Sequence, residues 1–94
     1  MIEWTGAANS QLNQAHDYIA SVNGEQIAAR IIEQIISTVQ RLESFPMLGR
    51  QGRVEGTREL VIVNTPFIAA YTLAKDRIVI LALYHGAQRW PEMF

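Results

Sequence analysis

Between Arg58 and His85 the sequence reads RELVIVNTPFIAAYTLAKDRIVILALYH. Three apolar runs of strand length, rich in β-branched residues, are separated by Asn64-Thr65-Pro66 and by Lys75-Asp76. Turn-forming residues between such runs are typical of β-hairpins. We therefore predict a three-strand antiparallel meander, with strands at Arg58–Val63, Phe67–Ala74 and Arg77–His85.

These predicted strands are apolar on both faces, since Val79 to Leu83 is an unbroken apolar run. An antiparallel sheet with one wet face should alternate between apolar and polar residues, so both faces should be covered. Two short helices can cover one face. We expect the other face to receive a partner chain, in preference to closure by the loop Pro46–Thr57 or the tail Gly86–Phe94.

The N-terminal half predicts a short strand and two amphipathic helices. Ile2–Trp4 alternates as a strand does, and Thr5 can cap a helix that runs from Gly6 to Val22. We expect Asn23 to cap the second helix in a capping box with Gln26. That helix should end at Phe45-Pro46, because proline disfavours helical geometry in the residue before it.

The element order is therefore β-α-α-β-β-β, an α+β fold in which a helical hairpin packs on one face of an antiparallel sheet of about four strands. With 94 residues, the chain (1–94) is expected to form a single domain.

Composition excludes several kinds of chemistry. The chain has no cysteine and two histidines, which excludes disulfides, thiolate metal sites and a cysteine nucleophile, and we expect no metal and no cofactor. His16, beside Asp17, is interpreted as a solvated histidine. Met1 leads directly into Ile2-Glu3-Trp4 without a basic start or a long apolar run, so we expect a cytoplasmic protein and no membrane insertion.

Arginines concentrate in the C-terminal half. The planar guanidinium suits carboxylate or phosphate contacts, although a solvated rim with no ligand would show the same pattern. The net charge of −1 argues against non-specific binding to nucleic acid, and we expect no sequence-specific DNA binding by this chain alone. The five arginines in question are Arg50, Arg53, Arg58, Arg77 and Arg89.

Several of these residues have two interpretations. Arg58 is either a strand-edge arginine paired with a carboxylate or a contact to a target or phosphate. Tyr71 is either a core tyrosine with a satisfied hydroxyl or a contact residue. His85 is either a buried histidine or a functional base, and Trp90 either packs the tail or anchors an interface. The sequence contains no paired carboxylates, serine–histidine–acid order or metal-ligand spacing.

A set of short motifs resembles the RelE/ParE toxins of bacterial type II toxin–antitoxin modules. The motifs are Gly49-Arg50, Gly56-Thr57-Arg58-Glu59-Leu60, Pro66-Phe67-Ile68 leading to Tyr71, Ile80 to His85, and Trp90-Pro91. The resemblance covers nearly the whole chain, including the helical hairpin that ends in Leu42 and Pro46. The resemblance implies the fold predicted above and a cognate antitoxin whose disordered segment folds over the toxin.

The family has two kinds of target, since RelE-like members cut messenger RNA on the ribosome and ParE-like members poison DNA gyrase. The resemblance implies that an RNase would carry an arginine three residues before Tyr71, where this chain has Ile68. Basic positions on the preceding strand correspond to Leu60–Val63, which are apolar. We therefore favour the ParE-like branch, acting by binding gyrase.

Two alternatives stay open. One is a ribosome-dependent mRNA endoribonuclease in which His85 is the base and Arg58 or Arg89 binds phosphate. The other is a partner-binding module without toxic activity. No catalytic residue is firmly assigned. The residues expected to contact the target or the antitoxin are Arg50, Arg53, Arg58, Tyr71, His85, Arg89 and Trp90.

Overall fold

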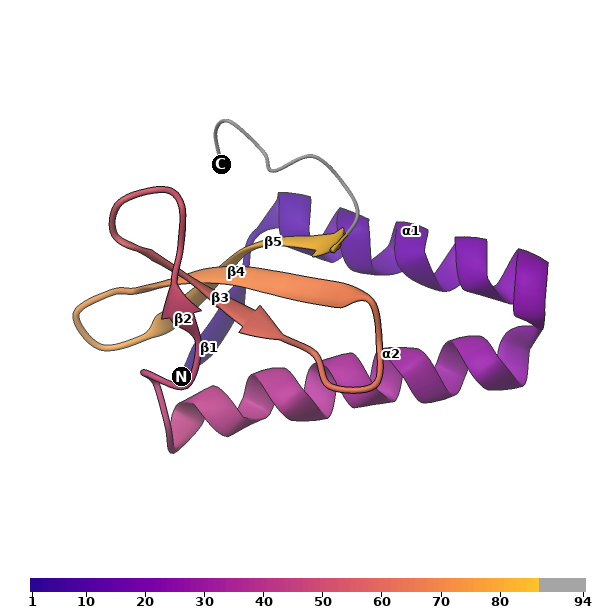
Figure 1. The fold of residues 1–94 in the computed structure, drawn as a ribbon, viewed down its shortest axis with the longest axis horizontal. Helices are drawn as coiled ribbons and strands as arrows, with labels where there is room; N and C mark the ends of the chain where they lie inside the picture. The colour runs from indigo at the N-terminus through magenta and orange to yellow at the C-terminus, as the bar shows by residue number, and fades with distance from the viewer. Residues whose placement is uncertain (87–94) are drawn as a thin grey trace.

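A computed structural model describes residues 1–86 as two helices packed against a five-stranded sheet (Figure 1). This confirms the predicted α+β class and element order. The elements are β1 (Ile2–Trp4), α1 (Gly6–Asn23), α2 (Glu25–Gln40), a 3₁₀ turn η1 (Arg41–Glu43), β2 (Arg50–Gln51), β3 (Thr57–Val61), β4 (Phe67–Leu73) and β5 (Ile78–His85).

The strands lie in the order β1-β5-β4-β3-β2. β3, β4 and β5 form the predicted antiparallel meander, with a bulge in the pairing at Ala70/Tyr71. The sheet differs from the prediction in two details. It is mixed, because β1 runs parallel to β5, and it gains a fifth strand, β2, inside the segment predicted as a loop. A three-residue strand carries no signal of its direction, and a two-residue strand carries no periodicity.

The side chains of Thr5, which caps α1, and of Gln11 on α1 form hydrogen bonds with backbone groups of β5 that β1 does not reach. β1 pairs only with Ile78 to Ile80. Beyond it, Thr5 Oγ1 donates to the Leu81 carbonyl at 3.2 Å, and the Leu83 amide donates to Gln11 Oε1 at 2.8 Å. Backbone groups of an unpaired strand need such partners when they are partly buried. The start of α1 is thereby fixed alongside β5.

The helix boundaries test the predicted caps. Thr5 caps α1 as predicted, because its hydroxyl accepts from the Ala8 amide at 3.1 Å. The capping box of Asn23 with Gln26 is wrong, since Asn23 is the last residue of α1 and α2 has no side-chain cap. Gly24 alone makes the turn with a φ of 94°, a conformation that glycine adopts without steric penalty. One residue between the helices leaves no room for a separate capping residue.

Both helices contribute to one core on the same face of the sheet. Its largest fully buried side chains come from α2, η1, β4 and β5, together with the residue that follows β3. They are Tyr71, Ile35, Leu42, Ile62, Ile80 and Val39. The apolar stripes predicted for the helices are confirmed where they meet the sheet. At the far end the hairpin extends past the sheet, and Tyr18, Val22 and Ile27 are exposed there (Figure 1).

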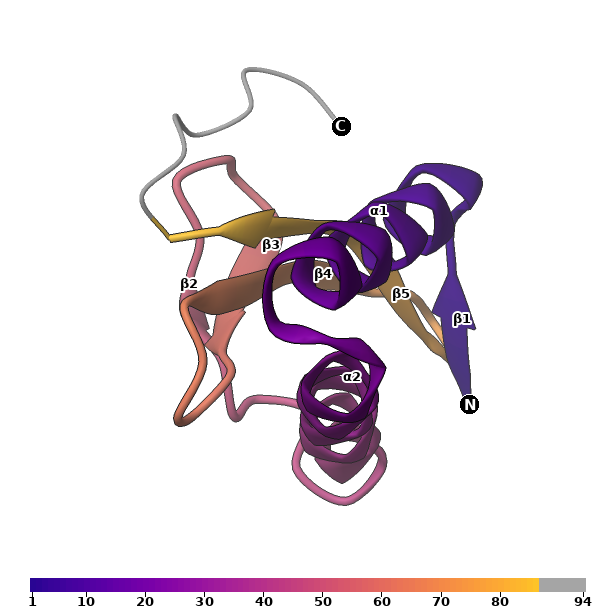
Figure 2. The same ribbon diagram turned by 90° about the vertical axis from the view of Figure 1, so that its right-hand side faces the viewer.

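His16 joins the two helices near the closed end of the hairpin, which Figure 2 shows nearly end-on. Its Nε2 lies 2.9 Å from Glu25 Oε1 on α2, and its Nδ1 lies 3.1 Å from Asp17 Oδ1. The predicted neighbour Asp17 is therefore one of two carboxylates that His16 meets. The hydrogen bond to Glu25, followed by that to Asp17, raises the pKa of His16 above 6.5.

This geometry predicts that the protein is more stable in mild acid relative to a variant without the imidazole. A raised folded-state pKa means that protonated His16 stabilises the fold fully below pH 6.5, and that this contribution is lost as pH rises through the folded-state pKa. His16→Gln should lower the melting temperature more at about pH 5.5 than at about pH 8.5. Glu25→Gln serves as the matched control and should reduce the same pH dependence. If His16→Gln lowered the melting temperature equally at both pH values, protonated His16 would not be the stabilising form.

Candidate partner-binding site

A buried carboxylate organises the surface around β2. Glu59 is 4% exposed, and its Oε1 accepts from Nε and Nη2 of Arg50 at 3.1 and 2.8 Å. Its Oε2 accepts from the Arg53 amide at 3.3 Å. A carboxylate this buried needs such partners, because an unpaired buried charge is strongly destabilising. Arg50, predicted as a contact residue, is therefore held by its fork while its side chain stays 61% exposed.

The segment between η1 and β2 is fastened to the sheet by Tyr71. The Tyr71 hydroxyl donates to the Pro46 carbonyl and accepts from the Gly49 amide, each at 2.8 Å. A Cβ at Gly49 would lie 2.6 Å from the Tyr71 ring and 2.8 Å from the Glu59 carbonyl, so glycine is required there. Tyr71 is fully buried, which agrees with the core interpretation and is incompatible with direct contact to a partner.

Arg58 lies on the same face of the sheet as Tyr71, with which it pairs across β3 and β4. Its Nη1 donates to the Gly49 carbonyl at 2.6 Å and approaches the Met47 carbonyl at 3.5 Å. The interpretation as an edge arginine paired with a carboxylate is wrong. β2 covers β3 at this point, and the neighbouring Glu59 is bound to Arg50.

The opposite face of the sheet carries a second, small core. Ala70, Ala82 and Tyr84 are buried there and pack with Ile68. Burial, followed by the nearby charge of Glu59, raises the pKa of Tyr84 to about 12. We expected this face to stay open for a partner, and at its centre that expectation is wrong. Ala70, Ala82 and Tyr84 are 0%, 3% and 7% exposed, so the centre of this face is already covered.

His85 ends β5 as an exposed residue, and its ring meets the Phe67 ring edge-on at 5.8 Å between centroids. This excludes the buried-histidine interpretation. Arg53 is exposed in the loop after β2. Arg89 and Trp90, which sequence reasoning also selected, lie outside the described residues.

An apolar patch at the outer edge of β3 escaped the sequence analysis. Leu48, Val61 and Val63 are exposed and line a cavity of about 270 Å³ beside Arg41 of η1 and Arg50 of β2. β2 pairs only with Arg58 and Glu59, so β3 has no strand on its outer side at Val61. The signal was present in the sequence, since the run Leu60–Val63 is apolar at consecutive positions that cannot all face the core.

No cluster of histidine, cysteine and acidic residues that could hold a metal ion occurs among residues 1–86. Within the same residues, no helix combines the length and apolar character needed to cross a bilayer.

Comparison with known proteins places the chain in a family. Residues 2–90 match the family described as ParE toxin of type II toxin-antitoxin system, parDE. A protein of Sinorhizobium fredii (strain NBRC 101917 / NGR234) named "Putative toxin Y4kP" is 36% identical over 92 residues, which cover 98% of this chain and 94% of that protein. The chain belongs to the ParE toxin family.

A solved structure agrees with this assignment. A chain from the chromosomal ParDE TA system of P. aeruginosa superimposes with a TM-score of 0.84 at 26% identity, covering 89% of this chain and 92% of that chain. The resemblance to RelE/ParE toxins, and to the ParE branch in particular, is confirmed.

Of the residues that an RNase reading of this ParE-family chain would use, the structure describes Arg58 and His85, and it does not bring these two together; Arg89 lies outside the described residues. Arg58 pairs with Tyr71, and His85 pairs with Phe67. The two pairs are four residues apart along β4, about 13 Å, and Arg58 and His85 lie on strands that flank β4 on opposite sides. Leu60 and Ile62 are buried and Ile68 packs in the small core, so none of these positions supplies a cation.

Removing the Tyr71 hydroxyl tests how firmly the segment 46–49 is held. Tyr71→Phe leaves the Gly49 amide without its acceptor and the Pro46 carbonyl without its donor. We expect a loss of about 1–3 kcal/mol in the free energy of unfolding, measured by urea denaturation. Tyr18→Phe, at an exposed tyrosine on α1, is the matched control and should change little. Equal stability of the two variants would contradict the role given to the Tyr71 hydroxyl.

Proposed function

We propose that this ParE-family toxin acts by binding and poisoning DNA gyrase, and that a cognate antitoxin neutralises it by binding to it. The single observation that carries the gyrase reading is the apolar character of Leu60–Val63 and Ile68. The resemblance implies cations at these places in toxins that cut RNA. Without them, Arg58 is the one cation on β3 and β4 that could stabilise the charge that develops on a cleaved phosphodiester.

The separation of Arg58 from His85 supports the same proposal. A base and a phosphate-binding group act together only when both reach one reacting centre, within about 3 Å each. Binding to a protein target requires no such convergence. Arg50, Arg53 and His85 are exposed around the β2 loop and the end of β5, and they are the proposed contacts to the target.

A supercoiling assay with purified protein tests the target. We expect the protein to inhibit supercoiling by gyrase and to accumulate cleaved DNA, while messenger RNA in cells that express it stays intact. His85→Ala should weaken the inhibition of gyrase, because one proposed contact is lost, without abolishing it, because no chemistry depends on the imidazole. Codon-biased cuts in messenger RNA that disappear in His85→Ala would overturn the proposal in favour of the RNase. Expression without any growth defect would favour a partner-binding module.

The antitoxin is proposed to cover the patch formed by Leu48, Val61 and Val63. Three exposed apolar side chains next to an uncovered strand edge favour a partner that supplies an apolar surface or an added strand. Arg41, at the same cavity, would favour an acidic residue on that partner.

Val61→Asp should weaken the complex with the antitoxin at least about tenfold in Kd, because a carboxylate would then have to be buried against apolar side chains. The measurement is calorimetry with the antitoxin encoded beside this chain. Val22→Asp, at an exposed valine on the hairpin tip, is the matched control and should leave Kd unchanged. A loss of affinity in Val22→Asp alone would move the antitoxin to the hairpin.

A further inference from the structure

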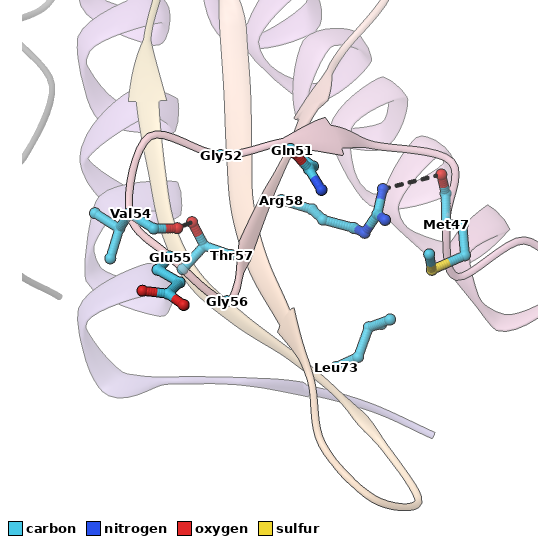
Figure 3. A pocket seen from close by; sticks show the side chains of 9 residues that line it. All are labelled: Met47, Gln51, Gly52, Val54, Glu55, Gly56, Thr57, Arg58 and Leu73. Carbon is cyan, nitrogen blue, oxygen red and sulfur yellow. Dashed lines mark hydrogen bonds between the residues drawn. The ribbon is translucent and has the colours of Figure 1, made fainter.

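A cavity of about 320 Å³ lies beside β2, on the face of the sheet that Arg58 shares with Tyr71 (Figure 3). It is bounded by the segment before β2, the loop that joins β2 to β3, and the end of β4. Its lining residues are Met47, Gln51, Gly52, Val54, Glu55, Gly56, Thr57, Arg58 and Leu73. A cavity of this volume holds a side chain together with a short stretch of the peptide that carries it.

Arg58 is the cation of this cavity, and its charge is not neutralised by any carboxylate of residues 1–86. Figure 3 shows its side chain reaching across the cavity towards the Met47 carbonyl. Both of its hydrogen bonds come from Nη1, so Nε and Nη2 make none within the described part of the chain. A half-buried guanidinium with donors to spare favours an anionic ligand.

The rim of the cavity is held in place before any ligand arrives. The Gly52 amide donates to the Thr57 carbonyl at 2.8 Å, and the Thr57 hydroxyl donates to the Val54 carbonyl at 2.6 Å. Gly56 has a φ of 82°, and its carbonyl accepts from the Thr72 hydroxyl at 2.7 Å. A loop bonded in this way loses little conformational entropy on binding.

The walls are mixed in character. Met47 and Leu73 expose apolar side chains on one side, and Gln51 and Glu55 are polar. One arginine and one glutamate give the cavity no net charge, whereas nucleic acid binding depends on several cations acting together. The surroundings therefore suit a single carboxylate within an otherwise apolar segment better than they suit a phosphodiester chain.

We propose that this cavity binds one aspartate or glutamate side chain, flanked by apolar residues, from an extended segment of a partner polypeptide. The carboxylate accepts from Nε and Nη2 of Arg58 while its apolar neighbours contact Met47 and Leu73. The proposal goes beyond the assignment of the target: it concerns a recognition element of this chain and holds whether or not gyrase is the protein poisoned.

The test is an NMR titration of the purified protein with the capped peptides Ac-Leu-Asp-Leu-NH₂ and Ac-Leu-Asn-Leu-NH₂, and with inorganic phosphate. The aspartate peptide should shift the Arg58 Nε–H signal and the amides of Gly52 and Gly56, with a Kd in the millimolar range. The asparagine peptide, which lacks the charge, should bind at least about tenfold more weakly. Phosphate should cause no saturable shift at these positions.

Two variants complete the test. Arg58→Gln should abolish the shifts caused by the aspartate peptide, and Arg58→Lys, which keeps the charge and loses the fork, should bind about tenfold more weakly. Arg77→Gln, at an arginine 3.6 Å from Glu3 on the opposite edge of the sheet, is the matched control. The lysine variant keeps the test valid if loss of the bond to the Gly49 carbonyl unfolds the glutamine variant.

Three outcomes would overturn the proposal: equal binding of the aspartate and asparagine peptides, tighter binding of phosphate than of the aspartate peptide, or wild-type binding by Arg58→Gln. None of them depends on gyrase. If the aspartate peptide binds and gyrase is not inhibited, only the proposal that gyrase is the target is rejected. If gyrase is inhibited and the peptide does not bind, only the proposal for this cavity is rejected.

Discussion

The surface of this toxin depends on one buried charge. Glu59 points away from the helices, in a sheet whose neighbouring residues Ala70 and Ala82 offer it no hydrogen bond. Its carboxylate is therefore stable only if another part of the chain brings donors to it. Arg50 and the Arg53 amide do so, and in doing so they draw the loop after η1 into the sheet as β2. β2 lines both cavities, with Arg50 at the apolar patch and Gln51 at the cavity that holds Arg58.

The same interaction divides the arginines into two kinds. Arg50 is committed to Glu59, and replacing Glu59 would leave its guanidinium without a partner while freeing β2 from the sheet. Arg58, the residue before Glu59 on β3, points to the other face, where its partners among residues 1–86 are carbonyl oxygens. Adjacent positions on a strand face opposite sides, so one arginine can serve the fold while the other keeps its charge for a ligand.

The sequence was sufficient to predict the elements that local periodicity encodes. It was insufficient to predict the contacts between side chains that are distant along the chain. The helical stripes, the Thr5 cap and the three-strand meander follow from spacing between near neighbours. β2 could not be predicted, because it forms through the contact of its Arg50 with Glu59, nine residues further along the chain, and not through any periodicity of its own two residues. The Tyr71 hydroxyl bonds to Pro46 and Gly49 across more than twenty residues of chain, so only its burial was foreseeable.

The candidate site was predicted unevenly for a related reason. A list of arginines and aromatics selects residue types, and it cannot separate Tyr71, which is fully buried, from Arg53, which is exposed. The expectation of an open far face failed because it considered the apolar residues alone. The charges of Glu59, Arg53 and Arg50 act on Tyr84, so polar side chains lie near the small core on the face that was expected to be open. The exposed apolar surface lies instead at the strand edge, which a face-by-face reading of the sheet does not consider.

That edge bears on the choice between the two kinds of toxin that share this scaffold. Leu60 and Ile62 are buried in or against the helix-side core, where a lysine would require an unpaired buried charge. Val61 and Val63 are exposed, and at these positions a lysine would be tolerated by the fold without penalty. Their apolar character therefore does not follow from folding. We attribute it to the proposed contact with another polypeptide, and a strand edge adapted to such contact is one on which the cations of an RNase are absent. The valines at 61 and 63 therefore both expose apolar surface and leave these positions without the cations that an RNase would need.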